Sequence, residues 1–274
     1  MVLKGNLLYN GDFELGTTEG WELGAFGKLA QHTFIASEEA KLRGNYGGRL
    51  TADVDYAQSY LAYDKVCSFE EYEAYLFICP FKMVDGFYNL GYLYGLDDKG
   101  NLIDDFWIGF NNETGIWRNI IALLRGYSDI SHFKVGMYIY SNNMRDEFYI
   151  DEAKLYPLKS IKAVELAETR NFDNVTTCLT WYSGLACIGK CKLRSIVRVS
   201  DVWGTNPTLD ITLRIGLLVN TGTTYILQHT QFTAEGFEEK TIDLPEVCYI
   251  KVEYTLGGDS PSFDIYHHLF VEPY

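Results

Sequence analysis

The chain has 274 residues, 47% hydrophobic and 15% aromatic, which is enough apolar material for sizeable cores in two domains. Its formal net charge of −14 argues against nucleic acid as a partner, because phosphate binding needs a basic face, and against anionic membrane surfaces. Tyrosine is the most abundant aromatic residue, with 21 copies, and aromatic side chains fit the pleated surface of β-sheets.

The chain enters a strand pattern soon after Met1, with no signal-peptide pattern and no apolar run long enough to cross a bilayer. We therefore expect no membrane insertion. A virion or intracellular location fits this start, unless a signal was removed from a mature protein.

Cysteine spacing leaves three interpretations open. The six cysteines are Cys67, Cys79, Cys178, Cys187, Cys191 and Cys248. Buried free thiols in a reducing compartment are the first interpretation, and one or two disulfides are the second. A metal site is the third and weakest, because the one close pair, Cys187 and Cys191, lacks a second ligand pair.

The first 157 residues show strand patterns separated by turns. Residues 6–9 predict an opening strand that ends in an Asn10–Gly11 turn, and the three glycines between Leu42 and Leu50 predict a bulge or tight turn before the next strand. Later strands are predicted within 56–82 (two strands), 87–96, 105–110, 116–124, 133–140 and 148–156. The segment 116–124 also fits a short helix, and residues 97–101 predict a hairpin turn.

Pro157 predicts the boundary between two domains, 1–157 and 158–274. After it, residues 161–170 fit a helix or a strand equally well. Residues 193–202 and 209–217 predict strands, the second with clean alternation, and residues 257–261 predict a turn. Strands at this spacing predict an all-β fold of two tandem β-sandwich (jelly-roll) domains.

Four sequence pieces in the first domain carry a family resemblance. They are Asn6–Leu7–Leu8 with Asn10–Gly11–Asp12–Phe13–Glu14 and Gly20–Trp21, the glycine-rich segment 44–50, Ile116–Trp117–Arg118, and the closing strand 148–155. In this order they resemble a carbohydrate-binding module of the galactose-binding-like jelly-roll type. The resemblance covers residues 1–157 only, and the same fold also serves in adhesins and viral structural proteins.

The resemblance implies a structural calcium that ties the first and last strands together. By position, Glu14 and Asp151 would supply carboxylates, and the loop at Gly44 and Asn45 would supply backbone carbonyls, a set of oxygen ligands that suits calcium. The alternative is that Glu14 and Asp151 are ordinary strand-end acids that cap turns.

Sugar binding by such a domain needs flat aromatic faces with polar groups at the rim. The candidate ligand-binding residues are Tyr88, Tyr92, Tyr94, Trp107, Tyr138 and Tyr140, because the tyrosines of each strand share one face. If the strands are neighbours in one sheet, these side chains form a platform for a glycan. The alternative is that the tyrosines fill core edges and subunit contacts.

No catalytic arrangement stands out, so we expect the protein not to be an enzyme. The acid pairs Asp97–Asp98 and Asp104–Asp105 flank a hairpin, and Glu238–Glu239 reads as a surface run, so we expect them to be solvated. The sequence thus predicts non-catalytic recognition of a glycan or polysaccharide. The alternative is a structural assembly subunit, such as a virion capsid, decoration or surface-layer protein, that forms homo-oligomers.

Overall fold

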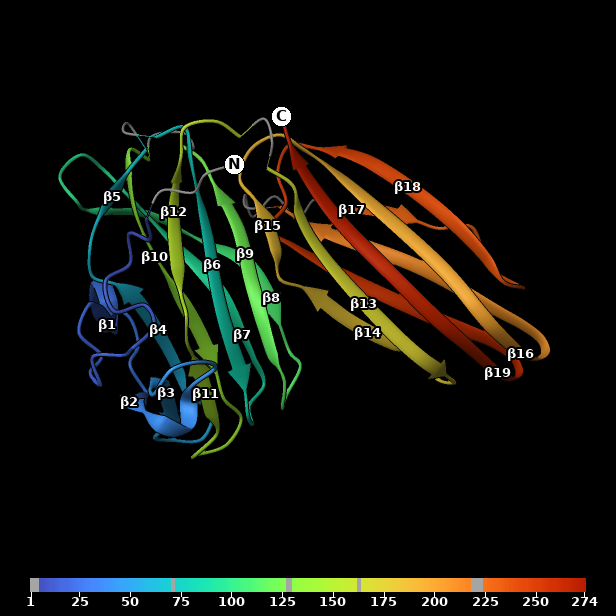
Figure 1. Ribbon diagram of the computed structural model, residues 1–274, viewed down its shortest axis with the longest axis horizontal. Coiled ribbons are helices and arrows are strands. Elements are labelled where there is room, and N and C mark those ends of the chain that lie inside the picture. Colours follow the sequence, from blue (N-terminus) through green and yellow to red (C-terminus); the bar gives the residue numbers. More distant parts are fainter. Residues whose placement is uncertain (1–4, 70–71, 127–129, 162–163, 218–223) are drawn as a thin grey trace. The chain divides into compact units, whose positions relative to one another are not determined.

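The structure is a computed structural model that describes residues 5–69, 72–126, 130–161, 164–217 and 224–274. It divides into two compact units, Met1–Ile161 and Lys162–Tyr274 (Figure 1). Within the described ranges, the helices are two short 3-10 turns, η1 (Ala25–Gly27) and η2 (Glu38–Ala40), and no helix has the length and apolar character needed to cross a membrane. The predicted all-β class is confirmed.

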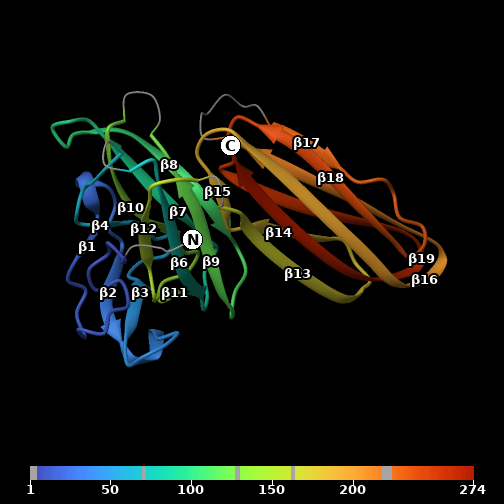
Figure 2. The same ribbon diagram turned by 45° about the horizontal axis from the view of Figure 1, so that its top comes forward.

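The first unit is a sandwich of two antiparallel sheets. One sheet has the order β1 (Trp21–Leu23), β4 (Gln58–Tyr63), β10 (His132–Tyr140), β7 (Tyr88–Leu96), β8 (Leu102–Asn111), and β5 (Cys67–Ser68) also pairs with β10. The other has the order β9 (Trp117–Leu124), β6 (Ala74–Met83), β11 (Glu147–Ile150), β3 (Gly47–Ala52), β2 (His32–Ser37), and β12 (Lys154–Leu158) also pairs with β6. Both views show these strands as two layers (Figure 1, Figure 2).

Alternation along β10 places the core of this sandwich. Phe133, Val135, Met137 and Ile139 are buried on one side of the strand, as predicted. Phe133 packs edge to face against Tyr75 of β6 in the opposite sheet, with 4.9 Å between ring centroids. The other side of β10 therefore faces away from the sandwich interior, because successive side chains point to opposite faces of a sheet.

The predicted opening strand is wrong in its secondary structure. Residues 5–8 have no regular secondary structure, and turns begin at Tyr9. Asn10 (φ 52°) and Phe13 (φ 54°) are left-handed, so the backbone curls directly after the predicted strand. The segment nevertheless lies beside β12. The Leu7 amide donates to the Leu155 carbonyl at 2.9 Å, and the Asn6 side chain accepts from the Leu155 amide at 2.8 Å. The Asn6 side chain thus replaces a backbone partner of a regular ladder.

The predicted domain boundary falls inside an element, because β12 continues through Pro157 to Leu158 and the first unit extends to Ile161. The segment 161–170, which fits a helix or a strand, overlaps the start of β13 (Leu166–Val175), and its residues 162–163 lie outside the described residues. Residues 116–124 are also a strand, β9, and the predicted turn at 97–101 lies between β7 and β8.

The second unit is built on two long strands that fold back on themselves. These are β16 (Cys191–Gly216) and β19 (Tyr249–Pro273), and they pair with each other along both of their halves. The remaining strands are β13, β14 (Leu179–Ser183), β15 (Leu185–Cys187), β17 (Thr224–Gln228) and β18 (Gly236–Leu244). The first half of β16 pairs with β18, and the second half pairs with β17.

A side-chain contact shows the fold-back directly. The Tyr254 hydroxyl lies 2.7 Å from Nδ1 of His267 on the same strand, whereas a straight strand would separate residues this far apart in sequence by about 40 Å. The strand bends at the predicted turn, residues 257–261, where Gly258 (φ 96°) and Ser260 (φ 51°) are left-handed. The two halves of the unit therefore face each other as a second sandwich.

Candidate functional site

Aromatic side chains from four adjacent strands gather on the outer side of the sheet that contains β10. We call this surface the aromatic face; its members are Tyr60, Tyr88, Tyr92, Tyr94, Trp107, Phe110, Tyr138 and Tyr140. The register aligns Tyr138 with Tyr60 on β4 and Tyr140 with Tyr88 on β7. It also aligns Trp107 of β8 with Tyr92. All six predicted ligand-binding residues are therefore together on one face.

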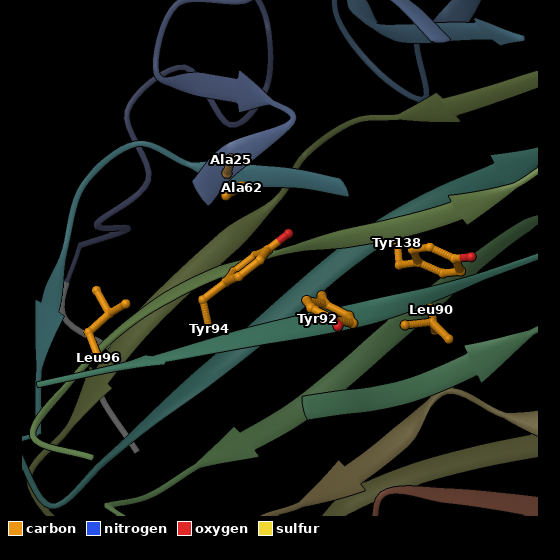
Figure 3. Packing of buried hydrophobic residues seen from close by; sticks show 7 residues of the cluster. All are labelled: Ala25, Ala62, Leu90, Tyr92, Tyr94, Leu96 and Tyr138. Atoms are coloured by element: carbon orange, nitrogen blue, oxygen red, sulfur yellow. The ribbon is translucent and has the colours of Figure 1, made fainter. Parts of the chain in front are cut away.

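The rings of the aromatic face hold one another in place. Tyr88 stacks on Tyr140 and on Phe110, each with 5.3 Å between ring centroids. Tyr60 packs against Tyr138 at 4.7 Å and against Tyr92 at 5.2 Å. The buried members form a hydrophobic cluster with Leu90, Leu96, Ala25 and Ala62 (Figure 3). Packing of this kind fixes side-chain rotamers before any ligand arrives.

The segment around η1 covers one end of the aromatic face. Gly24 (φ 74°), Phe26 (φ 58°) and Gly27 (φ 71°) are left-handed, so the chain makes a tight curl over the sheet. The Phe26 ring lies 5.3 Å from the Tyr94 ring. Tyr94 is consequently buried, and this burial raises the pKa of its hydroxyl.

Lys28, which follows the curl, anchors it electrostatically. Its Nζ forms an ion pair with Asp105 and lies over the Tyr60 and Tyr92 rings, 4.7 and 5.7 Å from their centroids. The Tyr92 hydroxyl donates to Asp105 Oδ1 at 2.6 Å. The expectation that Asp105 is merely solvated was wrong, because strand alternation turns it onto the aromatic face beside Trp107.

Exposure separates the predicted ligand-binding residues into two groups. Trp107 is 48% exposed, and Tyr88 and Tyr140 are half-buried. Tyr92 and Tyr94, at 3% and 0%, and also Tyr138 are buried. The first group can contact a ligand directly, whereas the second supports the first from below.

Polar groups border the rings. The Gln58 side-chain oxygen accepts from the Tyr138 hydroxyl at 3.0 Å, and Asp105 and Lys28 lie at the other end of the face. Apolar ring surface next to donors and acceptors is an arrangement that can bind a ligand with one apolar and one hydroxyl-bearing side.

The two predicted calcium ligands meet the same loop, residues 42–46, but through its amides. Asp151 Oδ2 accepts from the Leu42 and Arg43 amides at 2.7 and 2.9 Å. Glu14 Oε1 accepts from the Asn45 and Tyr46 amides at 2.6 and 3.0 Å.

The amide donors act on the two carboxyl groups to different extents, because burial raises the pKa of Asp151 in spite of them. Hydrogen bonds from the loop lower the pKa of Glu14. The loop turns N–H groups toward the carboxylates, so the expected carbonyl ligands at Gly44 and Asn45 do not join them, and this arrangement does not fit a calcium site. Among the described residues, no group of three or more His, Cys, Asp or Glu side chains could hold a metal ion.

Gly44 is required for this arrangement. Its φ of 68° is left-handed, and a Cβ at this position would lie 2.2 Å from Glu14 Oε1. The glycine-rich segment that the sequence singled out therefore serves the close approach of a carboxylate to the backbone.

Sequence reasoning missed Tyr60, Phe110 and Lys28. Alternation along β4 places Tyr60 on the same side as Ala62, but Tyr60 and Ala62 make too short a pattern to assign a face. The sequence offers no signal for Lys28, because the curl around η1 alone brings it over the sheet.

No protein-family model and no curated protein matches the sequence. Among solved structures, the CBM22-1–CBM22-2 tandem domain of Paenibacillus barcinonensis Xyn10C is similar over 99% of both chains, with 11% identity and a TM-score of 0.42. TmCBM61 in complex with β-1,4-galactotriose matches 56% of this chain and 99% of its own, with 17% identity and a TM-score of 0.40. Tailspike protein 4 of bacteriophage CBA120 matches 56% of this chain and 21% of its own, with 12% identity and a TM-score of 0.44. At these identities and TM-scores the similarities carry no argument about function, so the functional argument rests on the aromatic face.

Proposed function

We propose that the first unit is a non-catalytic glycan-binding module and that the aromatic face is its binding surface. The observation that carries this proposal is the convergence of aromatic rings from four neighbouring strands, bordered by Asp105, Lys28 and Gln58. A pyranose ring has an apolar side that packs on an aromatic side chain, and its hydroxyls bond to polar groups at the rim. Mutual ring packing lowers the entropy that binding would otherwise lose.

Trp107 is the expected anchor. It is the most exposed ring of the aromatic face, and it lies two residues from Asp105 on the same side of β8. A sugar stacked on its indole would have its hydroxyls within reach of the Asp105 carboxylate and the Lys28 ammonium. Tyr140, at the other end of the face, would contact the next residues of a longer glycan.

Binding to a glycan array and to immobilised polysaccharides tests the proposal. We expect the wild-type protein to retain at least one glycan, and Trp107→Ala and Tyr140→Ala to lower its affinity about tenfold each, which corresponds to ~1.4 kcal/mol. Trp203→Ala is a matched control, because Trp203 is 69% exposed but belongs to the second unit. A wild-type protein that retains no glycan, or variants that bind like wild type, would contradict the proposal.

A structural assembly role is the second candidate. The second unit exposes large apolar side chains, among them Trp203, Phe237 and Ile226, and exposed apolar side chains also occur at interfaces between subunits. Light scattering after size exclusion distinguishes the two: a monomer supports the binding module, and a stable homo-oligomer supports assembly.

Calcium at Glu14 and Asp151 stays a prediction. The resemblance supports it, whereas the amide hydrogen bonds of the loop at 42–46 argue against it. Chelation with EDTA separates the two, because only a calcium site would lose stability.

A further inference from the structure

Six side chains of the second unit form one hydrogen-bonded series, here called the buried polar chain. In order, it runs Trp181 Nε1–Tyr254 Oη 3.1 Å, Tyr254 Oη–His267 Nδ1 2.7 Å, His267 Nε2–Ser195 Oγ 2.7 Å, Ser195 Oγ–His229 Nε2 2.8 Å and His229 Nδ1–Glu238 Oε2 2.9 Å. Ser195 and His267 are 0% exposed. The contact order Ser195–His229–Glu238 is that of a catalytic triad, but a buried hydroxyl has no access to substrate.

The indole end of the buried polar chain fixes the direction of its first hydrogen bonds. The Trp181 indole N–H can only donate, so the Tyr254 oxygen accepts from it. The Tyr254 hydroxyl must then donate to Nδ1 of His267, its other partner. A neutral imidazole has one donor and one acceptor nitrogen, so Nε2 of His267 carries the hydrogen and donates to Ser195.

The Glu238 end of the buried polar chain fixes its hydrogen bonds consistently with the indole end. Burial acts to raise the pKa of the Glu238 carboxyl, but hydrogen bonds, two of them from Thr230, contribute to lowering it to about 2. Glu238 is therefore ionised at neutral pH and can only accept hydrogen bonds. Nδ1 of His229 therefore donates to Glu238, and its Nε2 accepts from the Ser195 hydroxyl. Every donor has one acceptor, both histidines are neutral, and their tautomers are opposite.

A proton added to the buried polar chain would set a donor against a donor, or would leave a buried hydroxyl hydrogen without an acceptor if that hydroxyl turned to accept from both neighbours. A hydrogen on Nδ1 of His267 would face the Tyr254 hydroxyl, whose hydrogen cannot turn toward the Trp181 N–H. A hydrogen on Nε2 of His229 would face the Ser195 hydroxyl, whose other neighbour is the His267 N–H. Either proton would also place a charge in the interior, which is costly without full pairing.

The charged groups around the two histidines do not offset this cost. Glu238 and Lys240 on β18 act on His229 with opposite signs, and burial keeps its pKa low. Burial lowers the pKa of His267 to about 3, with His229 and His268 acting in the same direction.

One more charged group lies nearby, on β13. Arg170 has its guanidinium carbon 4.8 Å from the centroid of the Trp181 ring, and it forms an ion pair with Glu168. The Glu168 carboxylate balances the positive charge of Arg170 at this end of the buried polar chain.

We propose that the buried polar chain makes the second unit pH-sensitive. The unit stays folded while both histidines are neutral, and it unfolds in acid when they take up protons. The first unit has a buried histidine of its own, His32, in a different hydrogen-bond arrangement. His32 lies between the Ser59 and Ser141 hydroxyls, each at 2.8 Å. The Ser141 hydroxyl can rotate and accept from a protonated ring, whereas the Ser59 hydroxyl already accepts from the Gln31 amide at 2.8 Å. In the second unit, Ser195 accepts from one histidine and donates to the other.

The tautomers can be measured directly. In the full-length protein at neutral pH, nitrogen chemical shifts should show hydrogen on Nε2 of His267 and on Nδ1 of His229. Acidification below about pH 6.5 should raise the unfolding equilibrium constant of the second unit by up to about tenfold per pH unit for each histidine, followed by loss of the Trp181 indole N–H signal. A His267 that is charged or carries hydrogen on Nδ1 at neutral pH would overturn the proposal.

A double variant tests the link between the histidines and acid opening. In His229→Gln with His267→Gln, each amide oxygen and amide nitrogen can replace the acceptor and donor nitrogens, so the direction of the buried polar chain is kept without a titrating group. We expect this variant to lose the acid-induced step. His268→Gln, on the opposite side of β19, is the matched control and should keep it. A double variant that opens at the same pH as wild type would overturn the proposal, and if it does not fold, the tautomers of the wild-type protein decide.

Discussion

Asp151 offers a way to separate a calcium site from an amide-held carboxylate. Its side chain is 1% exposed and accepts three backbone hydrogen bonds, from Leu42, Arg43 and Glu152, at 2.7, 2.9 and 2.7 Å. Asp151→Ala removes the acceptor of all three amides. The loop at 42–46 would then have lost its main attachment to the end of β11.

The size of the effect follows from the unmade hydrogen bonds. A buried donor left without an acceptor costs about 1–3 kcal/mol, and water can reach part of this loop, so we expect Asp151→Ala to lower the free energy of unfolding by ~3 kcal/mol. In a domain of this size, 1 kcal/mol changes the Tm by about 2–4 °C. The expected decrease in Tm is therefore about 6–12 °C. Glu14→Ala should have a smaller effect, because Glu14 is exposed and water can replace its carboxylate.

Differential scanning calorimetry with and without EDTA measures both effects. If the amides hold the carboxylates, EDTA leaves the Tm of the wild-type protein unchanged while Asp151→Ala lowers it. If EDTA lowers the wild-type Tm as much as the substitution does, and added calcium restores it, the amide argument is refuted and the predicted calcium site is supported. Linkage requires such a shift for any ion that binds only the folded state.

Gly136→Ala should prevent the first unit from folding normally, because a Cβ at this position would lie 1.9 Å from the Leu61 carbonyl oxygen. Gly126→Ala is the control, because the nearest atom to a Cβ there is 3.6 Å away. Circular dichroism measures the folding of both variants. Burial lowers the pKa of His32 to about 4, so the unfolded state takes up its proton first. The free energy of unfolding should therefore decrease as the pH falls from about 6.5 to about 4, by ~1.4 kcal/mol per pH unit; denaturant titrations that show no decrease would contradict this. Cys178 is exposed and should react with iodoacetamide in the folded protein, whereas the buried thiols should react only after unfolding, as mass spectrometry can show.

Alternation predicted much of the fold and part of the candidate site. The buried side of β10 and the shared face of Tyr88, Tyr92 and Tyr94 follow from the period of two in a strand. The hairpin at 97–101 follows from its Asp, Gly and Asn residues. These features depend on local geometry, which the sequence specifies residue by residue.

Local sequence patterns gave wrong predictions where a side chain interacts with a residue that is distant in the sequence. Residues 6–9 have the composition of a strand, but the Asn6 side chain takes the place of a backbone partner on β12. Glu238 reads as a surface acid, but the fold brings it to His229. Asp105 likewise reads as a solvated hairpin acid until Lys28 is placed over the sheet.

Local sequence patterns were sufficient to predict the all-β class, the strand faces and the aromatic composition of one of these faces, because alternation and turn chemistry act over a few residues. Which rings remain exposed depends on contacts between distant segments, since the curl around η1 helps to bury Tyr94 while Trp107 stays 48% exposed. The tertiary structure likewise explains why Glu14 and Asp151 accept from amides, because the direction in which a loop turns its peptide groups depends on its packing against distant strands.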